Sequence, residues 1–147
     1  MITLKQYLIE TMSQVAPHNW EYTDNSDARA TFNVGDVEYF VLFGSDEDTP
    51  TKWDIVFDIN NRPTTDEKYS TSNTGNASLV FSTVLQLVTE FVKLYPNVHT
   101  ITFTAKEQSR QKFYDRWAPL VARRIGNWNI RILQRGIKKY ILTKPIS

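Results

Sequence analysis

Residues 77–105, ASLVFSTVLQLVTEFVKLYPNVHTITFTA, place a long amphipathic segment before a short run of β-branched and aromatic residues. Apolar residues recur at three- and four-residue steps and leave a narrow polar stripe, which predicts a helix from about Ala77 to Tyr95. Pro96 follows the end of this helix, and Val98–Ala105 is predicted to form a strand. The wide apolar face indicates a helix that packs against a sheet.

The segment before this helix predicts a second strand, over Lys52–Ile59. Trp53, Ile55 and Phe57 alternate with Asp54, Val56 and Asp58, so one side of the strand is apolar and the other carries two carboxylates. A strand, a helix and another strand in this order form a crossover unit. We therefore expect Lys52–Ile59 and Val98–Ala105 to be parallel, with a right-handed connection.

The remaining signals add helices and hairpins around this unit. A helix is expected from Thr3, which has capping-box spacing with Gln6, and Pro17 is expected to end it or follow its end. Gly35-Asp36 between two alternating runs, Ala28–Val34 and Val37–Phe43, predicts a two-residue hairpin.

The C-terminal part predicts one more helix and one more hairpin. The helix should start near Glu107, with a kink or a restart at Pro119, because an interior proline costs about 3 kcal/mol. Trp128–Leu133 and Ile137–Thr143 should pair around Gln134-Arg135-Gly136. The order of elements is mixed α/β with an antiparallel first half.

Length and composition indicate one domain, residues 1–147. Hydrophobic residues make up 41% of the chain and charged residues 22%, which excludes a wholly disordered protein. The absence of cysteine excludes disulfides and a cysteine nucleophile, and two histidines are too few for a histidine-rich metal site, so no metal site is predicted. No stretch approaches about 18 consecutive apolar residues, so we expect a soluble, intracellular protein.

The net charge of +1 hides an uneven distribution of charge. Residues 1–105 hold 6 Lys+Arg and 14 Asp+Glu, a net of −8, whereas residues 106–147 hold 11 and 2, a net of +9. The basic part is suited to phosphates, nucleic acid or an acidic protein. The alternative, that the two parts neutralise each other across one fold, is equally open.

A glycine-containing turn precedes the long helix: Ser72-Asn73-Thr74-Gly75-Asn76-Ala77. Backbone N–H groups at a helix N-terminus bind phosphate, and a plain solvent loop with Thr74 or Asn76 as N-cap is the structural alternative. With the order of elements, this turn resembles the GNAT family of N-acetyltransferases, whose turn reads Gln/Arg-x-x-Gly-x-Gly/Ala; here Ser72 replaces the Gln/Arg. The resemblance implies a GNAT-like α/β fold, a twisted mixed sheet flanked by helices, with acetyl-CoA pyrophosphate bound at Ser72–Ala77.

The resemblance also implies candidate catalytic residues. Tyr114 occupies the position of the family's tyrosine that protonates the departing thiolate, but the family's Asn and Ala before it are replaced by Glu107 and Arg110. A ring packed in the helix stripe with its hydroxyl in water is the structural alternative. Asp58 is the best-placed base, with ordinary exposure on the strand as its alternative. His18 and His99 have no partner at a diagnostic spacing and are expected to be structural or exposed.

Basic residues concentrate near the C-terminus, with aromatic residues between them. The candidate binding residues are Arg123, Arg124, Arg131, Arg135, Lys138 and Lys139. They are suited to an acidic protein or to coenzyme phosphates, and less well to nucleic acid, because no nucleic-acid motif accompanies them.

A second resemblance covers Thr74–Ala77, Phe103–Ala105 and Tyr114–Arg116, which look like uncharacterised proteins of tailed bacteriophages. It implies a viral protein in the host cytoplasm or on the virus particle. Two functions stay open: a non-catalytic module that binds a host or viral macromolecule through its basic C-terminal face, which the substitutions in the GNAT motifs favour, and an acyl-CoA-dependent N-acetyltransferase. Fold alone does not decide between them.

Overall fold

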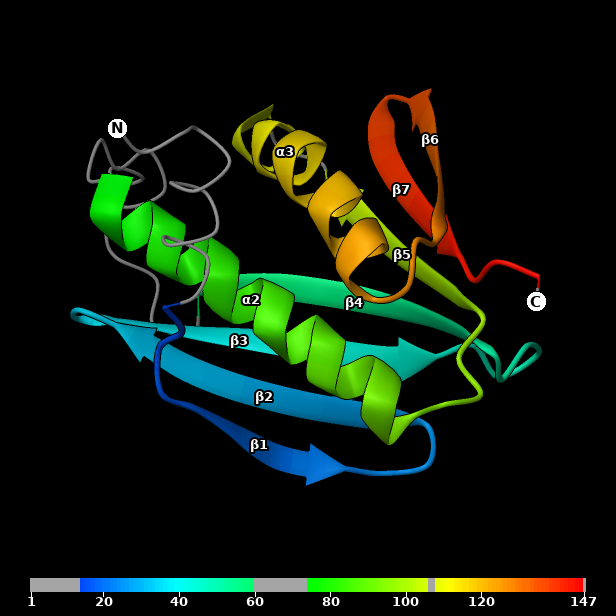
Figure 1. Cartoon of the computed structure of the whole chain (residues 1–147), viewed down its shortest axis with the longest axis horizontal. Helices are drawn as coiled ribbons and strands as arrows, with labels where there is room; N and C mark the ends of the chain where they lie inside the picture. The colour runs from blue at the N-terminus through cyan, green and yellow to red at the C-terminus, as the bar shows by residue number, and fades with distance from the viewer. Residues whose placement is uncertain (1–13, 60–73, 106–107, 147) are drawn as a thin grey trace.

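The computed structural model describes residues 14–59, 74–105 and 108–146, which form one mixed sheet and two helices (Figure 1). The elements are β1 (His18–Thr23), β2 (Asp27–Val34), β3 (Val37–Ser45), β4 (Lys52–Ile59), α2 (Thr74–Leu94), β5 (Thr100–Ala105), α3 (Gln108–Arg124), β6 (Asn129–Arg135) and β7 (Ile137–Thr143). The helix expected from Thr3 lies outside the described residues, except for Gln14 and Val15, which are not helical.

The seven strands follow the order β1-β2-β3-β4-β5-β7-β6. β4 and β5 are parallel and every other neighbouring pair is antiparallel, which confirms the predicted crossover unit and the antiparallel first half. A parallel pair needs a long connection that returns along the sheet, and α2 is that connection.

Both predicted hairpins are present. Val34 pairs with Val37 across Gly35-Asp36, and Gly35 has φ +62°, the positive value that a glycine-first two-residue turn requires. At the other end of the chain, Arg135 pairs with Ile137 across Gly136, which has φ +78°. Gln134 and Arg135, predicted to lie in the turn, are the last two residues of β6. Glycine adopts such angles without the steric penalty of a Cβ atom.

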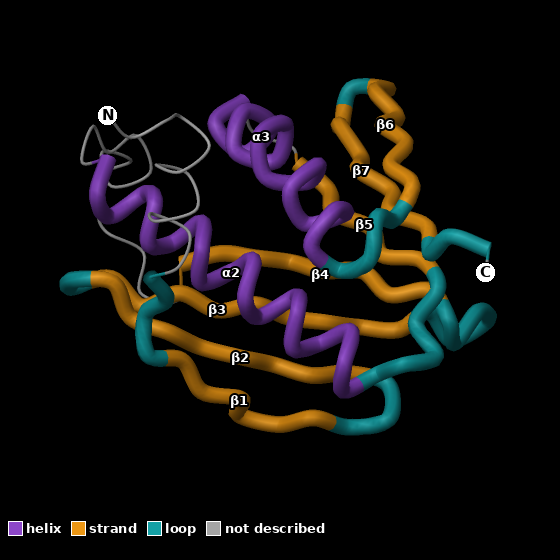
Figure 2. The backbone as a smooth tube through the Cα atoms, in the orientation of Figure 1, coloured by secondary structure: helices purple, strands orange, loops and turns teal. Residues whose placement is uncertain are grey.

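The core lies between the two helices and the face of the sheet that they cover. We call this covered face the inner face and the opposite face of the sheet the outer face. The alternation predicted for β4 is confirmed, since Trp53, Ile55 and Phe57 are buried there while Val56, on the outer face, is 52% exposed. Figure 2 shows both helices on the same side of the strands. The Phe91 ring of α2 stacks against the inner face of the sheet. α3 packs against the same face, and its side toward the sheet carries the fully buried Trp117.

Several helix and strand boundaries differ by one to three residues from the sequence prediction, and one strand was not expected. α2 starts at Thr74, three residues before the predicted Ala77, and β5 starts at Thr100 and not at Val98. β1 was missed because its sequence, HNWEYT, has no continuous apolar face. Polar contacts from α2, described below, hold it at the edge of the sheet.

Of the two alternatives predicted at Pro119, the restart is wrong, because α3 runs as one helix through it, and the kink stays a prediction. Proline has no N–H to donate to the carbonyl of Asp115, four residues earlier. The flanking Trp117, Ala118 and Val121 are all completely buried, whereas Pro119 itself is exposed. Burial of this apolar face therefore outweighs the loss of one helical hydrogen bond.

Replacing Pro119 by alanine should stabilise the protein. Pro119→Ala restores the missing donor and removes the ring clash, so we expect the free energy of unfolding to rise by about 2 kcal/mol. Urea unfolding followed by circular dichroism measures it. Arg116→Ala, at another exposed position of α3, is the control and should change stability by less than about 0.5 kcal/mol. An unchanged or lowered stability in Pro119→Ala would show that the helix is already distorted at this point.

Candidate functional site

β4 and β5 are paired along only part of their length. The register between them ends at Ile55 and Phe103, although β4 continues to Ile59 and β5 to Ala105. Figure 1 shows the two strands diverging beyond that point. We call this divergence at the carboxyl ends of β4 and β5 the fork. In open α/β sheets, ligands bind outside the carboxyl ends of the strands, so the fork is the candidate site.

Both helices begin at the fork end of the sheet. α2 follows β4 and α3 follows β5 in the chain, and Figure 1 shows α2 starting at the same end of the sheet at which β4 ends. The first N–H groups of a helix have no partner within the helix and carry its positive dipole end. Neither helix has an acidic residue in its first turn. This end of the sheet is therefore electrostatically suited to an anion.

The predicted phosphate-binding turn falls partly within α2. Thr74, Gly75, Asn76 and Ala77 form the first turn of the helix, so the glycine lies in the helix and not in the loop before it. Ser72 and Asn73 lie outside the described residues. The backbone of Thr74–Ala77 supplies the N–H groups that the prediction required.

Aromatic rings fill the inner side of the fork. The ring centroid of Phe113, from α3, lies 5.7 Å from that of Phe57 on β4 and 5.5 Å from that of Phe81 on α2. The indole N–H of Trp117 donates to the backbone carbonyl of Phe81 over 3.3 Å. These contacts join both helices to β4 and give the fork an apolar floor.

Tyr114, the predicted proton donor, is buried in this aromatic layer and is only 2% exposed. Its ring lies 5.6 Å from the rings of Phe103 and Tyr140 and 5.9 Å from that of Trp117, measured between centroids. The expectation that its hydroxyl reaches water is not met by a side chain with so little exposed surface. The part of the structural alternative that is confirmed is the packing of its ring in the helix stripe.

Asp58, the predicted base, projects from the other side of the sheet. It alternates with the buried Phe57 and Ile59, so it shares the outer face with Asp54, as predicted from the sequence. Its Oδ1 accepts the backbone N–H of Ile59 over 2.7 Å. Asp54 accepts a hydrogen bond from the Thr102 hydroxyl of β5. The sheet therefore lies between the two predicted catalytic side chains, and the structure does not bring them together.

The predicted basic residues lie at the C-terminal end of α3 and on the β6–β7 hairpin. We call this set of six the basic surface. Its four arginines are exposed and its two lysines are half-buried: Arg123, Arg124, Arg131, Arg135, Lys138 and Lys139.

Lys138 is the member of the basic surface held by an acidic partner. Its ammonium group lies 2.7 Å from Oδ1 of Asp115. The Tyr140 hydroxyl donates to the same oxygen over 2.6 Å. Hydrogen bonds from Lys138 and Tyr140 lower the pKa of Asp115 below its ordinary value. Burial, and then this carboxylate, raise the pKa of Tyr140.

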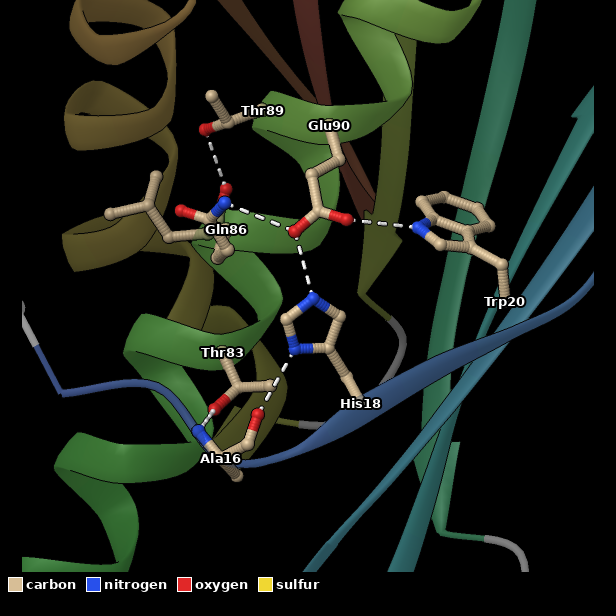
Figure 3. A network of polar contacts seen from close by, with 8 residues as sticks. Ala16, His18, Trp20, Thr83, Gln86, Thr89 and Glu90 are labelled. Carbon is tan, nitrogen blue, oxygen red and sulfur yellow. Dashed lines mark hydrogen bonds and ion pairs between the residues drawn. The ribbon is translucent and has the colours of Figure 1, made fainter.

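A polar cluster that the sequence did not reveal joins β1 to α2 (Figure 3). The carboxylate of Glu90 accepts from Nε1 of Trp20 over 3.0 Å and from the amide of Gln86 over 3.0 Å, and Nε2 of His18 lies 2.8 Å from it. Nδ1 of His18 lies 3.0 Å from the Ala16 carbonyl. The two groups that face the ring nitrogens of His18, the Glu90 carboxylate and the Ala16 carbonyl, are both hydrogen-bond acceptors.

The cluster stabilises the ionised form of Glu90. Burial tends to raise the pKa of this carboxyl, but the hydrogen bonds from Trp20, Gln86 and His18, with the charge of His18, outweigh burial and lower the pKa. The sequence prediction for His18, structural or exposed, is met in its structural form, since the side chain is 20% exposed and bonded on both sides. The sequence did not indicate its partner Glu90, because the two residues are 72 positions apart.

The part of the chain that the structure describes contains no candidate metal site and no candidate membrane-spanning helix. There, no three histidine, aspartate or glutamate side chains gather as a metal ion would require. No helix among these residues is long and apolar enough to cross a bilayer. The acidic turn contains instead a local hydrogen bond, from the Asp48 N–H to Oδ1 of Asp46 over 3.0 Å.

The fold class expected from the sequence, a mixed sheet flanked by helices, is present. No protein-family model matches the sequence, and no curated protein is similar to it. Among solved structures, RimL, the ribosomal L7/L12 alpha-N-protein acetyltransferase in complex with coenzyme A, is similar at 10% identity with a TM-score of 0.46. A protein described as a GNAT-family acetyltransferase from Desulfovibrio desulfuricans is similar at 17% identity with a TM-score of 0.41.

These similarities extend over most of this chain. The RimL similarity covers 81% of the chain and the Desulfovibrio similarity covers 80%. The chain spans 63% of the length of the RimL chain and 67% of the other.

Acid should remove the stabilisation that Glu90 provides. Because the pKa of Glu90 is lowered in the folded protein, its contribution is present above the ordinary value of 4.5 and is lost as pH falls through the folded value. We expect Glu90→Gln to destabilise the protein at pH 7 by about 1–3 kcal/mol, and by less near pH 3. Urea unfolding across this range tests it, with Glu47→Gln, in an exposed loop, as the control. A loss that does not depend on pH would contradict the role of the carboxylate charge.

Proposed function

We propose that the fork binds the anionic end of an acyl-CoA donor and that the protein is acetyltransferase-like. The observation that carries this proposal is the divergence of β4 and β5 past Ile55 and Phe103, at the end of the sheet where α2 begins. Diverging strands expose backbone to a ligand that lies between them, and the start of a helix binds its phosphates.

The residues present at the fork fit such a donor. The first-turn N–H groups of Thr74–Ala77 would hold the pyrophosphate, with no acidic side chain in that turn to repel it. The apolar floor formed by Phe57, Phe81 and Phe113 suits the uncharged arm of the donor. When bound, the donor supplies an activated thioester whose acyl group an amine can accept.

Acyl transfer also needs proton transfer, which the geometry supports less well than it supports donor binding. The amine must lose a proton, and the thiolate must gain one, as the C–N bond forms and the C–S bond breaks. Asp58 and Tyr114 lie on opposite faces of the sheet, so the geometry does not support the two acting as a pair on one amine and one thioester. Donor binding is therefore the part of the function that the geometry supports best.

Coenzyme A titration tests the proposal. We expect saturable heat of binding by calorimetry, and an at least tenfold weaker affinity in Gly75→Trp, because a bulky side chain in the first turn of α2 obstructs the anion. Gly44→Trp is the matched control: a Cβ at Gly44 meets no atom within 4 Å, and the position lies on the outer face of β3. Absence of binding at millimolar coenzyme A, or equal loss in both variants, contradicts the proposal.

A second function is favoured by a separate observation. Residues 116–147 contain eight Lys+Arg and no Asp or Glu, and the arginines of the basic surface are exposed. We propose that this surface binds an acidic macromolecule of host or viral origin, a protein in preference to nucleic acid. The bacteriophage origin and the location in the host cytoplasm or on the virus particle stay predictions of the sequence resemblance.

Probes of defined charge distinguish these partners. We expect poly-L-glutamate to bind at low salt, more weakly as ionic strength rises, and poly-L-lysine not to bind. A single-stranded oligodeoxynucleotide of matched charge should bind less tightly than poly-L-glutamate in fluorescence anisotropy. Tighter binding of the oligonucleotide would make nucleic acid the partner, and equal binding of the two polypeptides would exclude an electrostatic surface.

A further inference from the structure

β6 is an edge strand whose whole length is open to solvent. It lies at the end of the strand order and pairs with β7 from Asn129 to Arg135 without interruption. All seven of its residues are exposed. The opposite edge is different, because β1 has a bulge between Trp20 and Tyr22. Bulges protect sheet edges from pairing with other strands, and β6 has no bulge.

The two faces of β6 have different chemistry. Ile130 and Ile132 are opposite Leu142 and Tyr140, so they lie on the inner face, at 39% and 46% exposure. The outer face carries two arginines with one leucine between them: Arg131, Leu133 and Arg135. Successive side chains of a strand alternate between the faces, so β6 presents an apolar row on one side and a basic row on the other.

These features specify the strand that would pair with β6. We propose that β6 binds an extended segment of another protein in which acidic and apolar residues alternate, by addition of that segment as an eighth strand. This inference rests on the second proposed function, binding of an acidic protein by the basic surface. Main-chain hydrogen bonds would supply affinity, and the two rows would select the side chains.

The arrangement of charge sets the register of such a partner. Arg131 and Arg135 are four residues apart and so about 13 Å apart along the strand. Directly opposed residues in a sheet have Cβ atoms about 5 Å apart, so carboxylates at alternate positions of the partner reach both guanidinium groups. Its other residues then lie beside Ile130 and Ile132 and cover their exposed surface.

The same charge argues against a second copy as the occupant. Two β6 strands paired edge to edge place Arg131 and Arg135 of both copies on one face of the joined sheet, where like charges are destabilising. Lys139, on the outer face of β7, adds to this repulsion. Charged residues on edge strands are a recognised means of preventing such self-pairing.

Designed peptides test the proposal on the full chain. The probe is a fluorescently labelled, end-capped peptide of four Val-Glu repeats, compared with four Val-Lys repeats and with a block peptide of four valines followed by four glutamates. We expect the alternating acidic peptide to bind at least tenfold more tightly than either. Hydrogen exchange should show slower exchange at the β6 amides on binding, because strand addition pairs these amides.

Charge reversal locates the binding on the surface. Arg131→Glu/Arg135→Glu should weaken the Val-Glu peptide at least tenfold and strengthen the Val-Lys peptide. Lys93→Glu/Arg116→Glu, the matched control, makes the same change of charge at two exposed positions outside the basic surface and should weaken binding less than threefold. Circular dichroism confirms that both variants are folded.

Each other outcome overturns the inference in a distinct way. A loss of binding in Arg131→Glu/Arg135→Glu alone, with no slowed exchange in β6, shows that the basic surface binds without strand addition, and the second function survives. Equal losses in both variants show attraction by net charge alone and contradict both proposals. No binding of any acidic peptide or of poly-L-glutamate contradicts both. Slowed exchange in β6 that depends only on protein concentration, with a dimer in sedimentation, identifies a second copy as the occupant. Coenzyme A binding is measured separately and is not affected by any of these results.

Discussion

The packing of α2 against the inner face of the sheet is the interaction on which the rest of the structure depends. Phe91 is completely buried, and its ring centroid lies 4.5 Å from that of Phe43 and 5.1 Å from that of Trp53. These contacts fix the return path that makes β4 and β5 parallel neighbours. Without them, neither the core nor the order of the strands would be determined.

The polar stripe of the same helix has a structural role. The Ser82 hydroxyl donates to the Gln14 carbonyl, and the Thr83 hydroxyl accepts the Ala16 N–H over 2.9 Å. Further along the helix, Glu90 binds His18 and Trp20. One helix therefore packs the sheet by its apolar face and fixes the edge strand β1 by its polar stripe. Neither set of contacts joins β4 to β5 at the end of the sheet where the fork lies.

The elements predicted correctly are those whose signals are local. Alternation in Lys52–Ile59, and glycines at Gly35 and Gly136, are visible without knowledge of the rest of the chain. β1 was missed because its stabilising partners lie 70 to 72 residues away in sequence. Residue type identifies Tyr114 and Asp58 as candidate catalytic residues. It does not predict on which faces of the sheet they lie, because no local pattern says which face α3 will cover.

The strand order also bears on whether the acidic and basic parts neutralise each other. β1 and β6 are at opposite edges, six strand intervals of about 4.8 Å apart, which is about 29 Å. At physiological ionic strength the Debye length is about 8 Å, so charges on one edge are screened from those on the other. Charges on these two edges therefore act separately, although the net charge of the chain is only +1. A partner at β6 would experience the arginines of that strand and the cations near it, which is how a nearly neutral protein would select the proposed acidic strand.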